Sequence, residues 1–422
     1  MSGILFAVCV LLKRLSTGRI SHMNLSRYKF NRMEVAGSLG DLGTLLPISI
    51  GIILINGLSP TGVFFTIGLF YILTGIYFGI TVPVQPMKVI GAYAITTAMT
   101  QEQIMASVAL MGIFLFFIGI TNIITVLGRF IHKPVVRGVQ LTTGTLLMAE
   151  GVRFMIGTSK FQVLHQSVEP YMIIQKISGI PVGIVIGILG VILTFILLEN
   201  KKFPAALVII LAGLVLGLIL GTHEGLDKIK PGINFPDILP FGLPSGADFT
   251  FALFALVLPQ LPMTLGNAVV ANTHLANEYF GDDAGRSTYR ALTVSMALAN
   301  LFSFIVGGIA LCHGAGGLAA HYRFGARTAG SNIIIGVLFL LLAVFLGVHS
   351  IAVINLIPMA ILGVLLLFAG SQLTLTVIDL KERRDMFVAL LILGVTLASN
   401  LAVGFVAGIV FNYLLRIEKL KI

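Results

Sequence analysis

The sequence predicts an all-α polytopic membrane protein with 14 transmembrane segments, arranged as 7+7 inverted repeats whose broken third and tenth helices meet at mid-membrane. Three observations lead to this fold class. Hydrophobic residues make up 57% of the 422 residues and charged residues only 10%, against about 25% in soluble proteins. The apolar sequence divides into segments of spanning length. Polar breaks containing proline or glycine interrupt it once in each half.

The first half contains seven apolar segments. A spanning helix needs about 20 apolar residues, and a broken helix needs fewer. The predicted segments are Val35–Ile55, Thr61–Thr81, Met87–Met99, Ile104–Val126, Val135–Met155, Pro181–Leu198 and Phe203–Leu220. Residues 1–32 are predicted to form a cytoplasmic tail. Its apolar run Gly3–Leu12 is too short to span and lacks the preceding basic residue of a signal peptide. Met23 is an alternative start, in which case residues 1–22 are a dispensable tail.

The second half follows a polar stretch, 222–248, which is predicted to be an extracellular linker. Its segments are Phe249–Leu275, Ala291–Ala310, Gly314–His321, Asn332–Leu346, Ala352–Leu373 and the two parts of Met386–Leu415. The last block counts twice because Ser399 and Asn400 interrupt it. The two halves therefore contain seven segments each.

The first break is the segment Pro83–Lys88. Pro83 ends the preceding helix, since proline lacks a backbone donor, and Pro86 suits the first turn of the next. A helix that begins in mid-membrane leaves unpaired N–H groups, which are tolerated where they line a cavity or bind a ligand. Its positive dipole end favours an anion. Such a break is typical of a transporter substrate site, with Gln85, Pro86 and Met87 as candidate contacts.

The second break is the glycine-rich run that starts at His313. Glycines allow backbone N–H groups to approach an oxyanion closely, and they also serve ordinary close helix packing. His313, Gly314 and Ala315 are the candidate contacts here. At nearly the same offset that relates the two halves, Gln85 aligns with His313.

A short motif recurs in both halves. Glu34–Asp41 aligns with Gln260–Asn267 at an offset of 226, and both contain Ser/Thr-Leu-Gly-Asp/Asn. Because seven is odd, two such halves must have opposite orientations in the membrane, with the site at their interface. The motif adds Ser38, Gln260, Thr264 and Asn267 as candidate substrate contacts, the last three at i, i+4 and i+7 on one helix face.

The charged residues near the breaks are candidates for ion coupling or charge balance. Asp41 is an intramembrane acid that could carry a proton or cation, since such acids are costly and are functional by default. Lys88 either adds charge to the site or pairs with Asp41, Glu34 or Glu150. Glu150 and Arg153 lie near a helix end, where a plain interfacial ion pair is expected.

The basic residues set the topology. With fourteen segments and both termini in the cytoplasm, the inside loops and tails hold 21 of the 27 Lys and Arg residues. The outside segments hold five, and Lys88 lies in the membrane. The net charge of +10 therefore marks the cytoplasmic face, and nucleic-acid binding is not expected.

The sequence contains no motif that indicates an enzyme. Cys9 and Cys312 lie far apart and offer neither a disulfide framework nor metal-ligand spacing, and no catalytic or phosphate-binding motif is present. We expect no cofactor and no metal, and the lack of a phosphate-binding motif argues against an ATP-driven pump.

Four motifs resemble the molybdate transporter family, a branch of the sulfate permease superfamily. They are Gly40–Pro47, Pro83–Lys88, Leu258–Asn267 and Cys312–Arg327, and the resemblance covers about residues 31–416 in order. It implies a uracil-transporter-type fold with the substrate between the third and tenth helices. It also implies core parts at 33–130 and 249–348 and gate parts at 131–221 and 349–422. A cytoplasmic regulatory domain after the last helix is not expected.

The implied function is secondary active import of molybdate across the plasma or inner membrane, with ion coupling. Sulfate and tungstate are close competitors, since one sequence does not distinguish these tetrahedral oxyanions. A nucleobase permease would favour a carboxylate in the eighth segment, and Phe249–Leu275 has none. A passive anion channel stays open as an alternative, although two converging broken helices favour alternating access. The resemblance leaves open whether the chain is a monomer or a homodimer.

Overall fold

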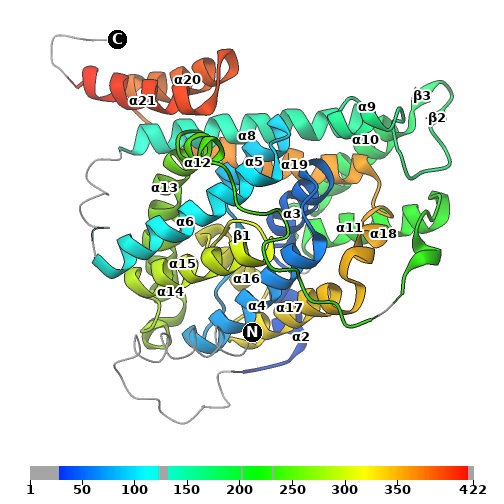
Figure 1. The fold of residues 1–422 in the computed structure, drawn as a ribbon, viewed down its shortest axis with the longest axis horizontal. Coiled ribbons are helices and arrows are strands. Elements are labelled where there is room, and N and C mark those ends of the chain that lie inside the picture. Colours follow the sequence, from blue (N-terminus) through cyan, green and yellow to red (C-terminus); the bar gives the residue numbers. More distant parts are fainter. Residues whose placement is uncertain (1–27, 122, 124–131, 201–202, 231, 417–422) are drawn as a thin grey trace.

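The computed structural model describes residues 28–121, 123, 132–200, 203–230 and 232–416. The proposed start at Met23, most of the N-terminal tail and the C-terminal end at Ile422 lie outside these residues, as does the end of the segment predicted at Ile104–Val126. The described chain is mostly helical, and its helices surround a short pair of strands near the centre (Figure 1).

The helices of the first half follow the predicted segments. The elements are α2 (Arg32–Ser38), α3 (Leu42–Asn56), α4 (Pro60–Phe78), β1 (Gln85–Pro86), α5 (Lys88–Thr97), α6 (Gln101–Thr121), α8 (Lys133–Ile156), α9 (Lys160–Leu164), β2 (Lys176–Ile177), β3 (Ile180–Pro181), α10 (Val182–Leu197), α11 (Ala205–Leu220) and η2 (Leu226–Lys228). The predicted segment Val35–Ile55 is bent by 44° between α2 and α3. The bend falls at Leu39–Asp41, within the motif that the sequence analysis selected, whose Ser38 and Asp41 are buried.

The second half contains several changes of helix type. Its elements are α12 (Gly246–Ala252), η3 (Leu253–Val257), α13 (Leu258–Met263), η4 (Thr264–Ala271), α14 (Asn272–Phe280), η5 (Gly281–Ala284), α15 (Tyr289–Val306), β4 (Leu311–Cys312), α16 (Ala315–Arg323), α17 (Gly330–Leu341), η6 (Leu342–Leu346), η7 (Gly347–His349), α18 (Ser350–Ile354), α19 (Met359–Thr374), η8 (Leu375–Asp379), α20 (Arg383–Ala398) and α21 (Leu401–Leu414). Of these, η3, η4 and η6 are π-helical turns.

Six helices of the described chain are long and apolar enough to cross a membrane, or seven if α2 and α3 form one bent span. Three shorter apolar helices, α10, α11 and α21, lie below that length. The fold is therefore that of a helical membrane protein. The full set of fourteen segments and their inverted repeats remains a prediction.

One predicted segment begins in the wrong place. The sequence pattern predicted a helix over Ala352–Leu373, but α18 ends at Ile354 and α19 begins only at Met359, after Pro358. The buried Glu169 carboxylate accepts hydrogen bonds from the backbone N–H groups of Met359 (2.7 Å) and Ala360 (2.8 Å). The break was hidden because Leu356 and Ile357 continue the apolar run across it.

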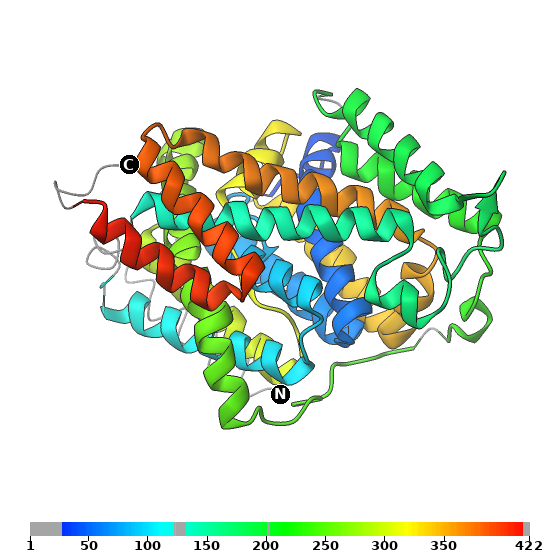
Figure 2. The same ribbon diagram turned by 90° about the horizontal axis from the view of Figure 1, so that it is seen from above.

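The helices pack through small residues. Along the contact of α8 with α19, Gly151 lies against the Gly363 backbone, so that a side chain at either position would overlap with the other helix. This close approach is the usual packing of membrane helices. Figure 2 shows α20 and α21 side by side, with α20 packed against α8 at one end of the molecule.

The linker before α12 runs along the outside of the helices (Figure 2). Leu239 donates its N–H to the Ile305 carbonyl at the end of α15 (2.7 Å). Asn234 donates its backbone N–H to Val344 (2.8 Å), whose carbonyl lies in the π-helical turn η6. These hydrogen bonds attach the predicted linker 222–248 to the ends of two helices.

Candidate functional site

The strands β1 and β4 join the two predicted breaks. They pair antiparallel, with Gln85 opposite Cys312 and Pro86 opposite Leu311. Met87 donates its N–H to Ala310 (2.8 Å), which extends the pairing by one residue. Because each strand leads directly into a helix, the starts of α5 and α16 lie close together at the centre of the molecule (Figure 1).

Gln85 lies fully buried between this strand pair and the start of α16. Its Nε2 donates a hydrogen bond to Asp41 Oδ2, between α2 and α3. Its Oε1 has no hydrogen-bond partner among the described residues. A Cβ atom at Gly314 would overlap with this Oε1, and one at Gly317 would lie 2.7 Å from both Asp41 Oδ2 and Gln85 Nε2. A side chain at either position would therefore displace the end of the Gln85 side chain. Gly317 was not among the predicted site residues.

The first turn of α16 is not capped. Gly314 is its N-cap residue, and no side chain of the described chain caps this helix. The N–H groups of Gly317 and Leu318 bond to the Gly314 carbonyl, within the helix itself. Ala315 is the first residue of α16. The start of this helix therefore presents its positive end to any ligand that binds beside Gln85.

The start of α5 is occupied by a protein side chain. Gln260 Oε1, from α13, accepts hydrogen bonds from the N–H groups of Val89 (2.9 Å) and Ile90 (3.4 Å). Gln260 Nε2 donates to Thr264 Oγ1 (2.9 Å), and both side chains are buried. The structure thus engages Gln260 with α5, and Thr264 with Gln260. The two broken helices are unequal: one is capped by the protein and the other is open.

His313 is held within the core. Its Nδ1 donates to the Pro83 carbonyl (2.8 Å), and its Nε2 lies 2.8 Å from Ser295 Oγ. The imidazole ring lies between Phe70 and Phe78, with centroid distances of 4.9 and 5.9 Å. The imidazole ties the segment before β1 to the segment before α16, which supports the position of Gly314.

Two further predicted residues bond to nearby backbone. Ser38 Oγ donates to the Val35 carbonyl (2.8 Å) within α2. Glu34 Oε1 accepts from the N–H groups of Arg327 and Thr328, both at 3.0 Å, before α17. Glu34 is therefore tied to the segment that follows α16.

Asp41 and Lys88 line one cavity of about 320 Å³. The remaining wall comes from the first turns of α3, from α16 including Gly316 and Arg323, and from α10, α11 and α19. The Lys88 ammonium interacts electrostatically with the Asp41 carboxylate. The cavity therefore brings one acid and one base of the predicted site to one face of α16, which includes Gly316 near the start of the helix.

Asn267 lines a second cavity, of about 430 Å³, between α8 and η4. Its Nδ2 would lie 3.6 Å from a Cβ atom at Gly314. Asn267 is therefore a residue of the second cavity that lies near the start of α16.

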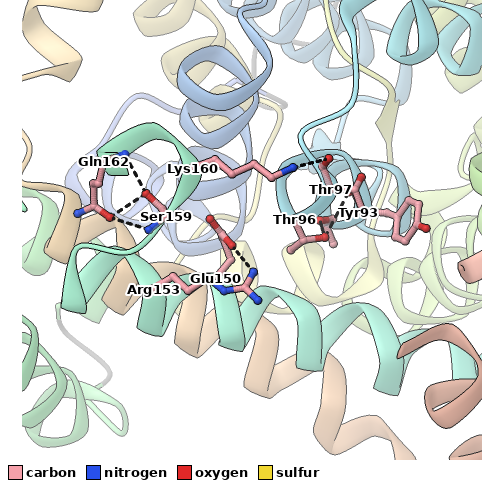
Figure 3. A network of polar contacts seen from close by, with 9 residues as sticks. Tyr93, Thr96, Thr97, Glu150, Arg153, Ser159, Lys160 and Gln162 are labelled. Carbon is pink, nitrogen blue, oxygen red and sulfur yellow. Dashed lines mark hydrogen bonds and ion pairs between the residues drawn. The ribbon is translucent and has the colours of Figure 1, made fainter. Parts of the chain in front are cut away.

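Glu150 and Arg153 form a local ion pair, as expected. Arg153 Nη1 lies 3.0 Å from Glu150 Oε2, one turn away on α8 (Figure 3). The same view shows Lys160 of α9 donating to the Thr97 carbonyl at the end of α5 (3.2 Å). A cation at a helix C-terminus is favourable, so Lys160 stabilises the end of α5 that is remote from the site.

Comparisons with known proteins agree with this fold. A family model described as "Molybdate transporter of MFS superfamily" matches residues 33–147 and 252–373. Molybdate transporter 2 of Arabidopsis thaliana is 30% identical over 421 residues, covering 92% of this chain and 88% of the relative. Molybdate transporter 1 of the same plant is 32% identical over 409 residues, covering 89% and 86%.

Two solved structures share the fold. The transmembrane domain of the cyanobacterial bicarbonate transporter BicA has a TM-score of 0.63 at 14% identity, over 92% of this chain and 98% of that domain. The murine anion transporter Slc26a9, in an inward-facing state, has a TM-score of 0.62 at 12% identity, over 98% and 76%. The family predicted from the four motifs is confirmed, and the chain belongs to the molybdate transporter family.

Proposed function

We propose that this protein is a secondary active transporter that imports molybdate by alternating access, with transport coupled to an ion. The observation that carries the proposal is the uncapped start of α16, enclosed by Gln85, Gly314 and Gly317 and next to the Lys88 ammonium. A helix N-terminus supplies N–H donors and about half a unit of positive charge. The Lys88 ammonium adds a full charge, and the two together suit a dianion.

The inequality of the two broken helices refines the binding site. Since Gln260 already fills the first turn of α5, we propose that the dianion bonds to the first amides of α16, at Ala315 and Gly316. Asn267 reaches the same position from the second cavity. Gln260 and Thr264 then act as positioning residues that hold α5, and with it Lys88, at the site.

Gln85 and Asp41 suggest how a proton is coupled to the anion. In the structure, Gln85 Nε2 donates to Asp41, and the unpartnered Oε1 lies at the start of α16, where it would repel an anion. Rotating the amide by half a turn places Nε2 toward the anion and Oε1 toward Asp41. That arrangement needs a protonated Asp41, because only then can the carboxyl group donate to Oε1. Anion binding and proton binding thereby favour each other.

The 7+7 inverted repeats with a core and a gate are part of the proposal. The offset of 226 that aligns Ser38 with Thr264 relates Gln85 to Leu311 and Pro86 to Cys312. Under a two-fold axis, the pairing of Gln85 with Cys312 maps onto that of Pro86 with Leu311, and both occur in β1 and β4. The Asp41–Lys88 cavity is bounded by α3, α5 and α16 on the proposed core side and by α10, α11 and α19 on the gate side.

We place both termini in the cytoplasm and the protein in the plasma or inner membrane, on the 21-to-5 division of basic residues. Cysteines introduced at Lys176 and Arg384, both exposed, are expected to react with an impermeant thiol reagent on opposite sides of the membrane. Labelling of both from the same side would contradict the topology.

Uptake into liposomes containing the purified protein tests the function. We expect molybdate to accumulate above equilibrium when a proton gradient is imposed, with competition by sulfate and tungstate and none by uracil. Accumulation that follows a sodium gradient would identify another coupling ion. Molybdate movement that only dissipates its own gradient would indicate a channel, and no molybdate movement would contradict the proposal.

Replacing Gln260 with alanine is expected to destabilise the protein. The N–H groups of Val89 and Ile90 would lose their acceptor inside the membrane, at a cost of about 1–3 kcal/mol per buried unpaired group. Gln260→Glu keeps an acceptor oxygen and is the matched control. Thermal unfolding in detergent should show a lower midpoint for Gln260→Ala than for Gln260→Glu. Equal midpoints for the two variants and the wild type would contradict the capping role.

A further inference from the structure

The second cavity contains a cationic cluster that the proposed site does not use. Lys133 and Arg137, on the first turns of α8, line the cavity together with the buried Gln140 and with Asn267. A water molecule occupies about 30 Å³, so 430 Å³ holds a small oxyanion with part of its hydration shell. The cavity is therefore large enough for a ligand beside these side chains.

Both cations are paired with the same carboxylate. Asp379 Oδ2 lies 3.1 Å from Lys133 Nζ and 2.6 Å from Arg137 Nη2, and Arg137 Nε donates to Oδ1 (3.0 Å). Arg137 Nη1 also donates to Gln140 Oε1 (2.7 Å). One carboxylate against two cations leaves a net charge of about one positive unit. The contacts of the described residues use three of the five guanidinium N–H groups and leave two for a further acceptor.

The cluster is fixed within one packed unit. Its residues lie on α8 and on η8, which directly follows α19, and α8 packs along α19. Gln140 Oε1 also accepts from Thr376 Oγ1 (3.0 Å), so the amide holds the guanidinium from a second side. The arrangement is therefore a preformed, cation-rich wall, and no described contact of the cluster bridges two parts that would separate in transport.

We propose that this cavity is a second anion site, which takes one tetrahedral dianion on its path between the start of α16 and the solution. The inference rests on the proposed function, because the ligand is the same anion. The connecting residue is Asn267, which lines this cavity and lies beside Gly314. Asp379 competes with the dianion for Lys133 and Arg137, so binding here is weaker than at α16, as suits a site of passage.

Because Asp379 competes with the anion for the two cations, the test compares the direction in which each variant changes anion affinity. If the cluster binds an anion, Lys133→Gln removes an attracting charge and Asp379→Asn removes a competing one, so their effects on affinity are opposite. If the cluster is only a structural ion pair, both variants lose the same contact and no effect on anion affinity of either sign is expected. Arg137 itself ties three groups together, and its variants are avoided because they could misfold.

Calorimetric titration of the purified full chain with molybdate measures both sites. We expect the wild type to bind two dianions, one tightly and one weakly. Lys133→Gln should weaken the second event and Asp379→Asn should strengthen it, each by roughly threefold to tenfold for these partly exposed groups. Arg384→Gln is the matched control, since Arg384 pairs with Glu382 on the surface and does not line the cavity.

Each outcome decides between the two proposals. A single tight event, unchanged in both variants, would overturn the second site and leave the proposed function standing. A weak event that shifts in the same direction in both variants, or in neither, would also overturn it. Absence of the tight event in the wild type would instead count against the site at α16.

Discussion

Valine at Gly314 is expected to abolish molybdate binding, by more than 100-fold, while the protein still folds. A Cβ atom there would overlap with Gln85 Oε1 at the open start of α16, so the side chain fills the space that the anion needs. Gly394→Val is the matched control, because a Cβ atom at Gly394 in α20 meets nothing within 4 Å. Equilibrium binding of molybdate to both purified variants, with thermal unfolding as the folding check, makes the comparison.

Gln85→Ala complements the steric variant. It removes a donor to a charged ligand, which costs about 1.5–3 kcal/mol, or roughly 10–150-fold in affinity. Wild-type affinity in both Gly314→Val and Gln85→Ala would mean that the anion binds elsewhere.

Asp41→Asn is expected to abolish gradient-driven accumulation and to leave molybdate binding in place. An asparagine amide donates to Gln85 Oε1 at any pH, so the amide of Gln85 can turn toward the anion without a proton. Between pH 6 and 8, wild-type affinity should rise as the pH falls, because binding favours the protonated carboxyl group. The affinity of the variant should not change over this range.

Glu278→Asn is the control for loss of a carboxylate, since Glu278 is exposed on α14. Accumulation by Asp41→Asn at the wild-type level, or a pH dependence that persists in this variant, would return Asp41 to a structural role.

The sequence located the two breaks because their chemistry is local. Proline at positions 83 and 86 and the glycines after His313 stop and start helices through their own backbone properties. The helices α5 and α16 begin within one residue of the predicted starts at Met87 and Gly314. The pairing of Gln85 with Cys312 joins residues more than 200 positions apart, and no local signal carries it.

The roles of Gln260 and Asn267 were harder to predict, for a geometric reason. The spacing i, i+4, i+7 assumes a regular α-helix, but Thr264–Ala271 forms the π-helical turn η4, which shifts the direction of every later side chain. Asn267, within this turn, consequently faces the second cavity, while Gln260 lies before the turn and caps α5. Glu34 and His313 likewise bond to backbone groups of distant segments, which their intramembrane position alone does not reveal.

The position of the bound anion tests the central claim most directly. Crystals grown with tungstate, which scatters anomalously, would locate the dianion without any assumption about transport. We expect an anomalous peak beside Gln85, with oxyanion oxygens about 3 Å from the amide nitrogens of Ala315 and Gly316. A principal peak at the start of α5, or one outside both cavities, would contradict the account.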